Sequence, residues 1–139
     1  MKRFLTVALL AATIALLPGL ARAEVADPPA AHRVVTICNF NWRTVAGVKS
    51  IIRCSVQKYP VSGGVGKAFY IADRESHFHY WARNSSSGAC GVYQHMPRYW
   101  PERWRTYGNG TVNDCYNGRS NVIVSIRMAH RGGWGPWGG

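Results

Sequence analysis

Acidic residues are scarce in this chain. Only 6 Asp and Glu stand against 17 Lys and Arg among 139 residues, which gives a formal charge of +11. The only long apolar run lies at the N-terminus, and no internal repeat occurs. The length fits one compact domain, and the 47% content of hydrophobic residues excludes a disordered or collagen-like chain. So basic a domain favours polyanionic partners.

Several catalytic and metal-binding motifs are missing as well. The chain has no H-E-x-x-H, G-x-S-x-G or G-x-x-x-x-G-K-[ST] sequence, which removes the usual support for a zincin, a serine hydrolase or a P-loop. No C-x-x-C pair occurs, and His77 and His79 lie two residues apart, so on a helix they point to different faces. We therefore expect neither a metal site nor a cofactor.

The N-terminal apolar run has the three parts of a secretory signal peptide. A basic start over residues 1–3 (MKR) precedes an apolar segment over 4–20, and residues 21–23 (ARA) form a small-x-small cleavage site. We expect cleavage after residue 23 and a secreted or cell-wall-associated protein with no stable membrane insertion. A membrane anchor is the less favoured alternative, because a Pro-Gly pair interrupts the run.

The four cysteines all lie beyond residue 23 and allow three disulfide pairings. An even count in an exported chain argues for two bridges. We favour Cys38–Cys54 and Cys90–Cys115, because each of these closes a short local loop. A zinc site is the less favoured alternative.

Apolar residues recur at the spacing of an amphipathic helix over residues 42–60, with Asn41 as the expected cap, and again over 65–81. Residues 121–129 are rich in β-branched side chains, which suits a strand, but small residues on one face favour a helix. These patterns predict a mainly helical domain with little or no sheet. The remaining expectations are a short strand over 33–40, short elements between 92 and 104, and loops over 84–88 and 106–120.

Glu75 stands apart among the few carboxylates. It follows apolar positions of the second expected helix at three, four and seven residues, so it lies on or beside the buried stripe. Aromatic residues crowd the next turn, and desolvation there would favour the protonated carboxyl that a general acid needs. The ordinary alternative is a solvated or ion-paired glutamate, with Arg74 or Arg83 as its partner.

Two sequence blocks lie a short distance apart around this residue. Residues 75–78 read ESHF, and residues 87–94 read SGACGVYQ, with Pro97 soon after. Together they resemble the paired signature of the soluble lytic transglycosylase catalytic domain, E-S-x-[FY] and then [SG]-x-G-[AS]-x-G-[LV]-x-Q. That family belongs to the lysozyme-like superfamily. Two blocks at the right separation are more specific than any single short motif.

The resemblance extends over residues 65–137. Residues 121–128 resemble the family's N-x-x-x-[AG] helix, and residues 130–137 (HRGGWGPW) stand where A-Y-N-x-G usually follows. This ending is similar to those of compact lysozyme-like domains such as the resuscitation-promoting factors. The implied fold is mainly α, an α+β lysozyme-like domain around the helix of Glu75. We divide the chain into a signal peptide (1–23), an N-terminal extension with a disulfide-linked helix (24–61) and a lysozyme-like transglycosylase domain (62–139).

The resemblance also implies a reaction, cleavage of the MurNAc–GlcNAc bond in peptidoglycan glycan strands. In this family the residue matching Glu75 protonates the leaving oxygen and then accepts a proton from the sugar's own C6 hydroxyl, which closes a 1,6-anhydro ring. Water is not the nucleophile, so a second carboxylate is not required. A lysozyme-type hydrolase is the alternative and needs Glu102 or Asp114 at ~5–9.5 Å from Glu75. A noncatalytic cell-wall-binding module with the same fold is another.

Further site residues follow from the same resemblance. Gln94 is implied to line the cleft and bond an N-acetyl sugar, with Ser76, Tyr93 and the Gly91 backbone shaping the site. The ordinary alternatives are a surface glutamine and a core tyrosine. We expect a monomer, with anionic cell-envelope polymers rather than nucleic acid as further partners.

The six tryptophans suggest sugar stacking, because aromatic faces pack on the apolar faces of sugar rings. For Trp134 and Trp137 we weigh this role equally against packing in the core. Trp42 and Trp81 are expected in the core. The candidates for stacking are Trp100, Trp104, Trp134 and Trp137.

Overall fold

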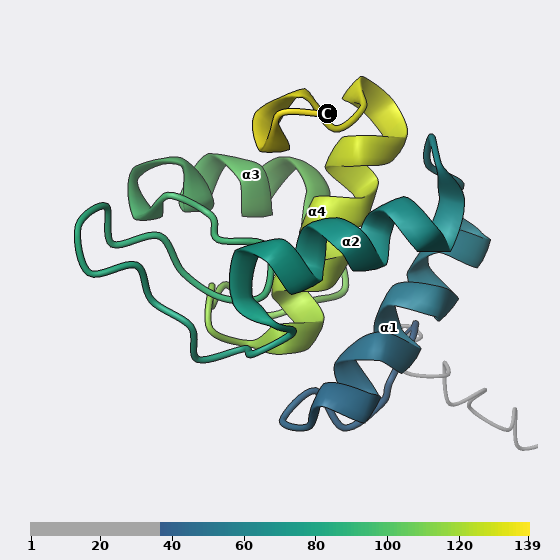
Figure 1. Ribbon diagram of the computed structural model, residues 1–139, viewed down its shortest axis with the longest axis horizontal. Helices are drawn as coiled ribbons and strands as arrows, with labels where there is room; N and C mark the ends of the chain where they lie inside the picture. The colour runs from purple at the N-terminus through teal and green to yellow at the C-terminus, as the bar shows by residue number, and fades with distance from the viewer. Residues whose placement is uncertain (1–36) are drawn as a thin grey trace, which may run out of the picture. The chain divides into compact units, whose positions relative to one another are not determined.

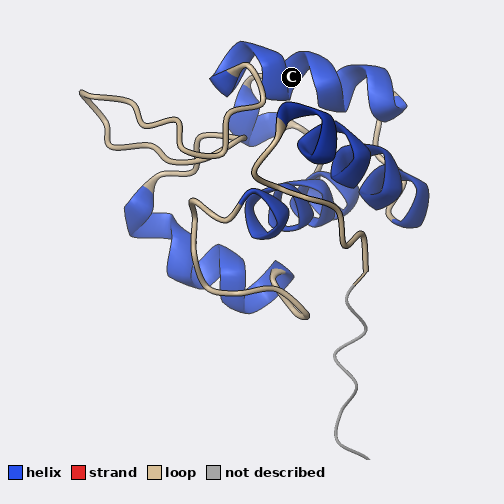
Figure 2. Cartoon of the chain, turned by 90° about the horizontal axis from the view of Figure 1, so that it is seen from below, coloured by secondary structure: helices blue, strands red, loops and turns tan. Residues whose placement is uncertain are grey.

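The computed structural model describes residues 37–139, which form helices and connecting loops with no strand in that range (Figures 1 and 2). The mainly helical prediction with little or no sheet is confirmed for these residues, where two isolated bridges join Cys90 to Arg83 and His95. The expected signal peptide lies outside the described residues. The elements are α1 (Val45–Lys58), α2 (Gly64–Ser76), η1 (Pro97–Tyr99), α3 (Trp100–Tyr107), α4 (Gly118–Gly132) and η2 (Gly135–Trp137).

The first helix begins later than its apolar pattern predicted. Thr44, not Asn41, is the N-cap, and its hydroxyl accepts a hydrogen bond from the Gly47 amide at 3.1 Å. The helix ends at Lys58, two residues before Pro60, as expected. The strand expected over 33–40 does not form in its described part, because residues 37–38 make a turn and residues 39–40 are irregular.

The second helix ends earlier than predicted, at Ser76 rather than at residue 81. His77 and Phe78 both take positive φ angles, 51° and 65°, which no helix accommodates. The Phe78 side chain is buried and meets the Phe69 ring edge to face at 5.7 Å, and this packing stabilises the unusual turn. Glu75 therefore lies in the last turn of α2 rather than in mid-helix.

The fourth helix is the centre of the molecule. Residues 118–126 are all buried, and α4 packs against both α1 and α3 (Figure 1). The helix predicted over 121–129 is confirmed and is longer, with the Asn117 side chain capping its start. A helical segment buried on every side, as residues 118–126 are, shows no clear apolar stripe, which explains the ambiguous sequence pattern.

One hydrophobic core joins the predicted N-terminal extension to the predicted catalytic domain. Ile51 and Ile52 of α1, Ile71 of α2 and Ile123 of α4 belong to the same buried cluster, and each is fully buried. Both predicted disulfides are present. Cys38–Cys54 joins the segment before α1 to that helix, and Cys90–Cys115 joins the two loops that flank α3. Among the described helices none is long and apolar enough to span a membrane.

A buried polar chain crosses the core beside α4. His95 is fully buried, and its Nε2 lies 2.7 Å from the Ser125 hydroxyl, which in turn donates to the Asn121 carbonyl at 2.7 Å. The other ring nitrogen of His95, Nδ1, lies 2.8 Å from Nη1 of Arg103. The Arg103 guanidinium can only donate, so Nδ1 accepts this hydrogen bond. Burial, assisted by the Arg103 charge, lowers the pKa of His95 to about 3. The imidazole is therefore neutral in the folded protein.

This burial predicts acid sensitivity. The unfolded chain takes up a proton on His95 near its ordinary pKa of ~6.5, while the folded protein does not until about pH 3. The stabilisation is therefore complete above pH ~6.5 and is lost as the pH falls, by up to about tenfold in the folding constant per pH unit. Denaturant unfolding between pH 6.5 and 4.5 measures this slope. His95→Gln should flatten it, and equal slopes in both proteins would contradict the assignment.

Candidate active site

Glu75 has one engaged and one open carboxyl oxygen. Its Oε1 accepts hydrogen bonds from Nη2 and Nε of Arg74 at 2.7 and 3.2 Å. Its Oε2 makes no hydrogen bond to the described residues, and the side chain is 24% exposed. The structure thus gives Glu75 the Arg74 ion pair that the sequence offered as the ordinary alternative to a desolvated, protonated carboxyl. The open oxygen of a half-buried carboxyl is a position from which a proton can be given or received.

Arg74 also connects α2 to the C-terminal turn. Its Nη2 donates to the Trp137 carbonyl at 2.6 Å, and Nε1 of Trp137 donates to the Tyr93 carbonyl at 2.8 Å. Among the described residues, Arg74 is the sole Lys or Arg that pairs with a carboxylate. These bonds connect three parts of the fold beside Glu75: the Arg74 guanidinium, η2, and the turn formed by residues 91–95.

Ser76 joins the two sequence blocks directly. It is buried, and its hydroxyl lies 2.8 Å from the Val92 carbonyl and 3.2 Å from the Ala72 carbonyl. These contacts occupy the hydroxyl with backbone acceptors. Ser76 therefore fixes the end of α2 against the 91–95 turn.

Gly91 and Gln94 define the shape of that turn. Gly91 has φ 76°, and a Cβ there would lie 2.3 Å from Asn121 Nδ2, so no other residue fits. Gln94 has φ 49°, and its Nε2 donates to the carbonyls of Gly91 and Ala82 at 2.8 and 3.1 Å. Its Oε1 makes no hydrogen bond to the described residues. The half-buried amide thus keeps one open acceptor.

Tyr93 is a core residue. It is fully buried, its hydroxyl donates to the Ala68 carbonyl at 3.0 Å, and burial raises the pKa of the phenol. Trp134 and Trp137 pack against its ring at 6.1 and 5.9 Å and are 3% and 7% exposed. Sugar stacking and core packing were both considered for these tryptophans. The structure favours core packing, because both rings are buried.

The exposed aromatic rings lie elsewhere than expected. Trp81, placed in the core by sequence reasoning, is 55% exposed and stacks on His79 at 4.5 Å. Tyr70, which sequence reasoning missed, is 59% exposed on α2, with the Arg74 guanidinium 5.8 Å from its ring. The sequence pattern that could have identified Tyr70 is its position one helical turn before Arg74, on the face of the helix away from the core. Both rings can stack on a sugar.

The other three carboxylates of the described residues lie outside this unit. Asp73 is exposed and lies 3.1 Å from Nδ1 of His77. Asp114 accepts the Tyr116 amide at 2.8 Å, the turn-capping role expected of it. Glu102 is exposed on α3 and pairs with no base among the described residues. Within residues 37–139 no group of His, Cys, Asp or Glu is arranged to hold a metal ion.

Asn121 of α4 holds the turn over residues 91–95 in place through its side-chain amide. Its Oδ1 accepts the Tyr93 amide at 2.8 Å, and its Nδ2 donates to the carbonyls of Cys90 and Cys115 at 3.1 and 3.0 Å. The side chain is fully buried, and both of its N–H donors and its carbonyl oxygen bond to the backbone of two loops. The sequence showed Asn121 only as the first residue of a helix motif.

Removal of this amide should destabilise the fold sharply. In Asn121→Ala the Tyr93 amide and the Cys115 carbonyl lose their partner, while the Cys90 carbonyl keeps the His95 amide, and we expect a loss of at least about 2 kcal/mol in the free energy of unfolding. Asn113→Ala, an exposed asparagine of the loop before α4, is the matched control and should change it by less than about 0.5 kcal/mol. Chemical denaturation measures both. A small loss in Asn121→Ala would mean that the amide does not organise the turn.

The site therefore offers an open carboxyl oxygen on Glu75, an adjacent cation on Arg74 and an open amide acceptor on Gln94. This set can move a proton at a polar bond and orient an amide-bearing ligand. Comparison of the chain with protein-family models, curated proteins and solved structures finds no match.

Proposed function

We propose that this protein is a secreted peptidoglycan lytic transglycosylase with a lysozyme-like fold and Glu75 as its general acid and base. The observation that carries the proposal is the hydrogen bond of 2.8 Å that the Ser76 hydroxyl donates to the Val92 carbonyl. This bond joins the two sequence blocks that resemble the family. Further support comes from the connection between Glu75 and the same turn through Arg74 and Trp137.

In the proposed reaction, Glu75 gives its proton to the oxygen that bridges MurNAc and GlcNAc. The bond from the MurNAc anomeric carbon to that oxygen breaks, and the C6 hydroxyl of the same MurNAc bonds to the anomeric carbon. The proton of that hydroxyl returns to Glu75, so no water is consumed and the acid is regenerated. Oε2 is the oxygen that holds the proton, because Oε1 faces Arg74.

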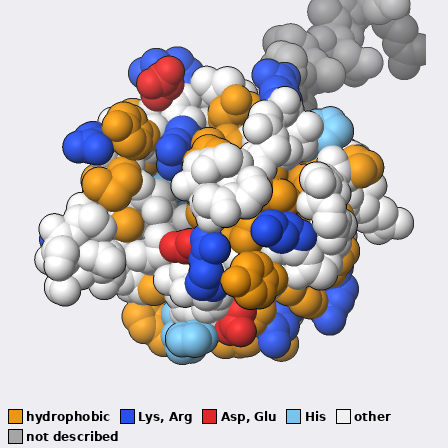
Figure 3. All heavy atoms as spheres, turned by 45° about the horizontal axis from the view of Figure 1, so that its top comes forward, with side chains coloured by type: hydrophobic (Ala, Val, Ile, Leu, Met, Phe, Trp, Pro, Cys, Tyr) orange, Lys and Arg blue, Asp and Glu red, His pale blue; other side chains and the backbone are white. Residues whose placement is uncertain are grey.

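Arg74 has a second acceptor for the protonated stage of the cycle. When Glu75 carries its proton, the attraction between the two side chains weakens, and the Trp137 carbonyl still holds the guanidinium at 2.6 Å. Gln94 Oε1 accepts from the N–H of an N-acetyl group, and Trp81 or Tyr70 stacks on a sugar ring. On the face shown in Figure 3, Lys and Arg side chains are spread widely and acidic side chains are few, which favours binding to an anionic cell wall.

A lysozyme-type hydrolase remains a second candidate because of Glu102. This exposed carboxylate pairs with no base among the described residues, and a hydrolase would require it at ~5–9.5 Å from Glu75 with a water between them. Asp114 is less suited, since its carboxylate caps a turn. The two reactions differ in their products.

Glu75→Gln should abolish cleavage while leaving the fold intact, because the amide keeps the shape but gives no proton. We expect a rate loss of at least ~10²–10⁴-fold on purified peptidoglycan. Glu102→Gln, which removes the same charge, should retain most of the activity. Thermal unfolding of both variants checks the fold. Full activity in Glu75→Gln would favour a noncatalytic wall-binding module instead.

The masses of the released fragments distinguish the two reactions. A transglycosylase releases 1,6-anhydromuramoyl ends, which are lighter than hydrolytic ends by the mass of one water molecule. We expect anhydro ends to predominate in the mass spectrum of a digest. Predominant reducing-end MurNAc, together with inactivity of Glu102→Gln, would identify a hydrolase.

A further inference from the structure

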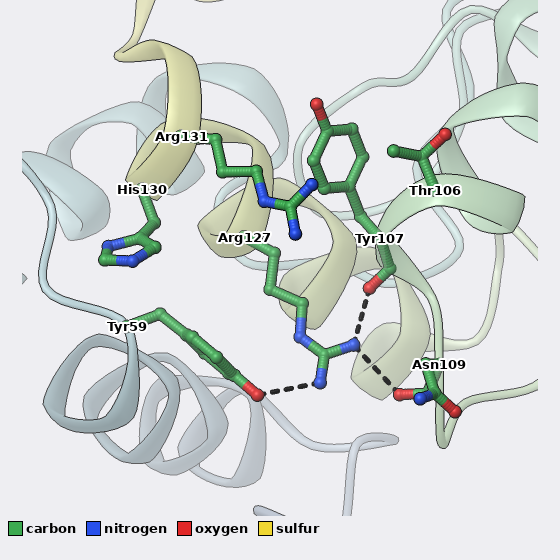
Figure 4. A pocket seen from close by; sticks show the side chains of 7 residues that line it. All are labelled: Tyr59, Thr106, Tyr107, Asn109, Arg127, His130 and Arg131. Atoms are coloured by element: carbon green, nitrogen blue, oxygen red, sulfur yellow. Dashed lines mark hydrogen bonds between the residues drawn. The ribbon is translucent and has the colours of Figure 1, made fainter.

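A cavity of about 400 Å³ lies away from Glu75, where the C-terminal ends of α1, α3 and α4 meet (Figure 4). Its volume is within the range of ~300–1,000 Å³ of small-ligand sites. No residue of α2 lines it. The lining side chains are Tyr59, Thr106, Tyr107, Asn109, Arg127, His130 and Arg131.

The walls of this cavity carry positive charge without a compensating carboxylate. Two arginines and a histidine line it, and no Asp or Glu does. The nearest acidic residue along α3, Glu102, lines a neighbouring hollow together with Arg103. The cavity is therefore a basic site in a chain whose surface is already rich in cations.

Arg127 forms the floor of the cavity. Its Nη1 donates to the carbonyls of Tyr107 and Asn109 at 2.7 and 2.9 Å, and its Nη2 donates to the Tyr59 hydroxyl at 2.7 Å (Figure 4). All three acceptors are neutral, so the charge of the guanidinium stays uncompensated while its position is fixed. A held cation of this kind is preorganised to attract an anion.

Further donors stand free at the rim. The Arg131 guanidinium makes no hydrogen bond to the described residues and lies 5.7 Å from the Tyr107 ring. His130 is not among these donors, because its Nδ1–H donates to the Pro60 carbonyl at 2.7 Å and Nε2 of the neutral imidazole is an acceptor. The hydroxyls of Thr106 and Tyr107 have no partner among the described residues. Donors thus come from α4 on one wall and from α3 on the other.

We propose that this cavity binds a phosphate group of a polyol-phosphate polymer of the cell envelope. A tetrahedral phosphodiester presents oxygens in several directions, which suits donors on two walls better than a planar carboxylate does. The choice of polymer rests on the proposed wall-cleaving function, whereas the phosphate chemistry rests on the cavity itself. Occupation of the cavity holds the enzyme on the wall while Glu75 acts at a separate site.

The test measures binding of a soluble poly(glycerol phosphate) oligomer to the full mature chain by titration calorimetry. Arg131→Gln should weaken binding by about tenfold or more, and Arg131→Lys should restore part of it. Arg53→Gln on α1 removes the same charge outside the cavity and should change binding by less than about threefold. Equal losses in Arg131→Gln and Arg53→Gln, or no binding by the unmodified chain, would overturn the proposal.

Three competing ligands separate the possible sources of the negative charge. Polyglutamate offers carboxylates, duplex DNA offers nucleic-acid phosphates, and phosphatidylglycerol vesicles offer lipid phosphates at matched charge concentration. We expect each to bind more weakly than the polyol phosphate and to be insensitive to Arg131→Gln. Preferred, Arg131-dependent binding of any of these would overturn the choice of polymer.

Phosphate binding in the cavity and peptidoglycan cleavage at Glu75 can be tested independently of each other. Arg131→Gln should cleave polymer-free peptidoglycan at the unmodified rate, and Glu75→Gln should bind the phosphate oligomer with unchanged affinity. A chain that binds the oligomer through Arg131 but cleaves nothing supports the cavity alone. A chain that cleaves but does not bind the oligomer overturns the cavity alone.

Discussion

The fully buried side-chain amide of Asn121 is the constraint on which the rest of the site depends. One carboxamide on α4 holds the Tyr93 amide and the carbonyls of Cys90 and Cys115, so two loops far apart in the sequence share one anchor. A buried group of this kind is worth much only when every hydrogen bond is made, which fixes one arrangement of the turn. That arrangement of the turn sets the positive φ angles of Gly91 and Gln94. It also places the Val92 carbonyl where the Ser76 hydroxyl bonds to it.

The second constraint is the scarcity of carboxylates. With so few acids, most cations of residues 37–139 have no ionic partner, and many bond to backbone carbonyls or lie over aromatic rings instead. Arg127 and Arg119 both cap backbone carbonyls across the fold. Among the Lys and Arg residues that the structure describes, Arg74 alone meets an acid, at the residue proposed to do the chemistry. The same shortage leaves the far cavity positively charged, so one feature of composition shapes both proposed sites.

Sequence reasoning predicted the features that depend on local pattern. The apolar period placed α1, the start of α2 and α4, and short loop closure gave both disulfides. It failed where a distant contact decides. The end of α2 is set by the burial of Phe78 against Phe69 and has no glycine or proline to mark it. The tie of Arg74 to Trp137 spans 63 residues, and no spacing rule reaches that far.

The two carbonyls that Asn121 holds belong to the two cysteines of one disulfide. The covalent bond keeps both acceptors close to each other in the unfolded chain as well, which lowers the entropy lost when the turn is ordered. In a reducing compartment this restraint is absent, and the turn must be ordered by the amide alone. The shape of the turn that adjoins Glu75 thus depends in part on the bond between Cys90 and Cys115.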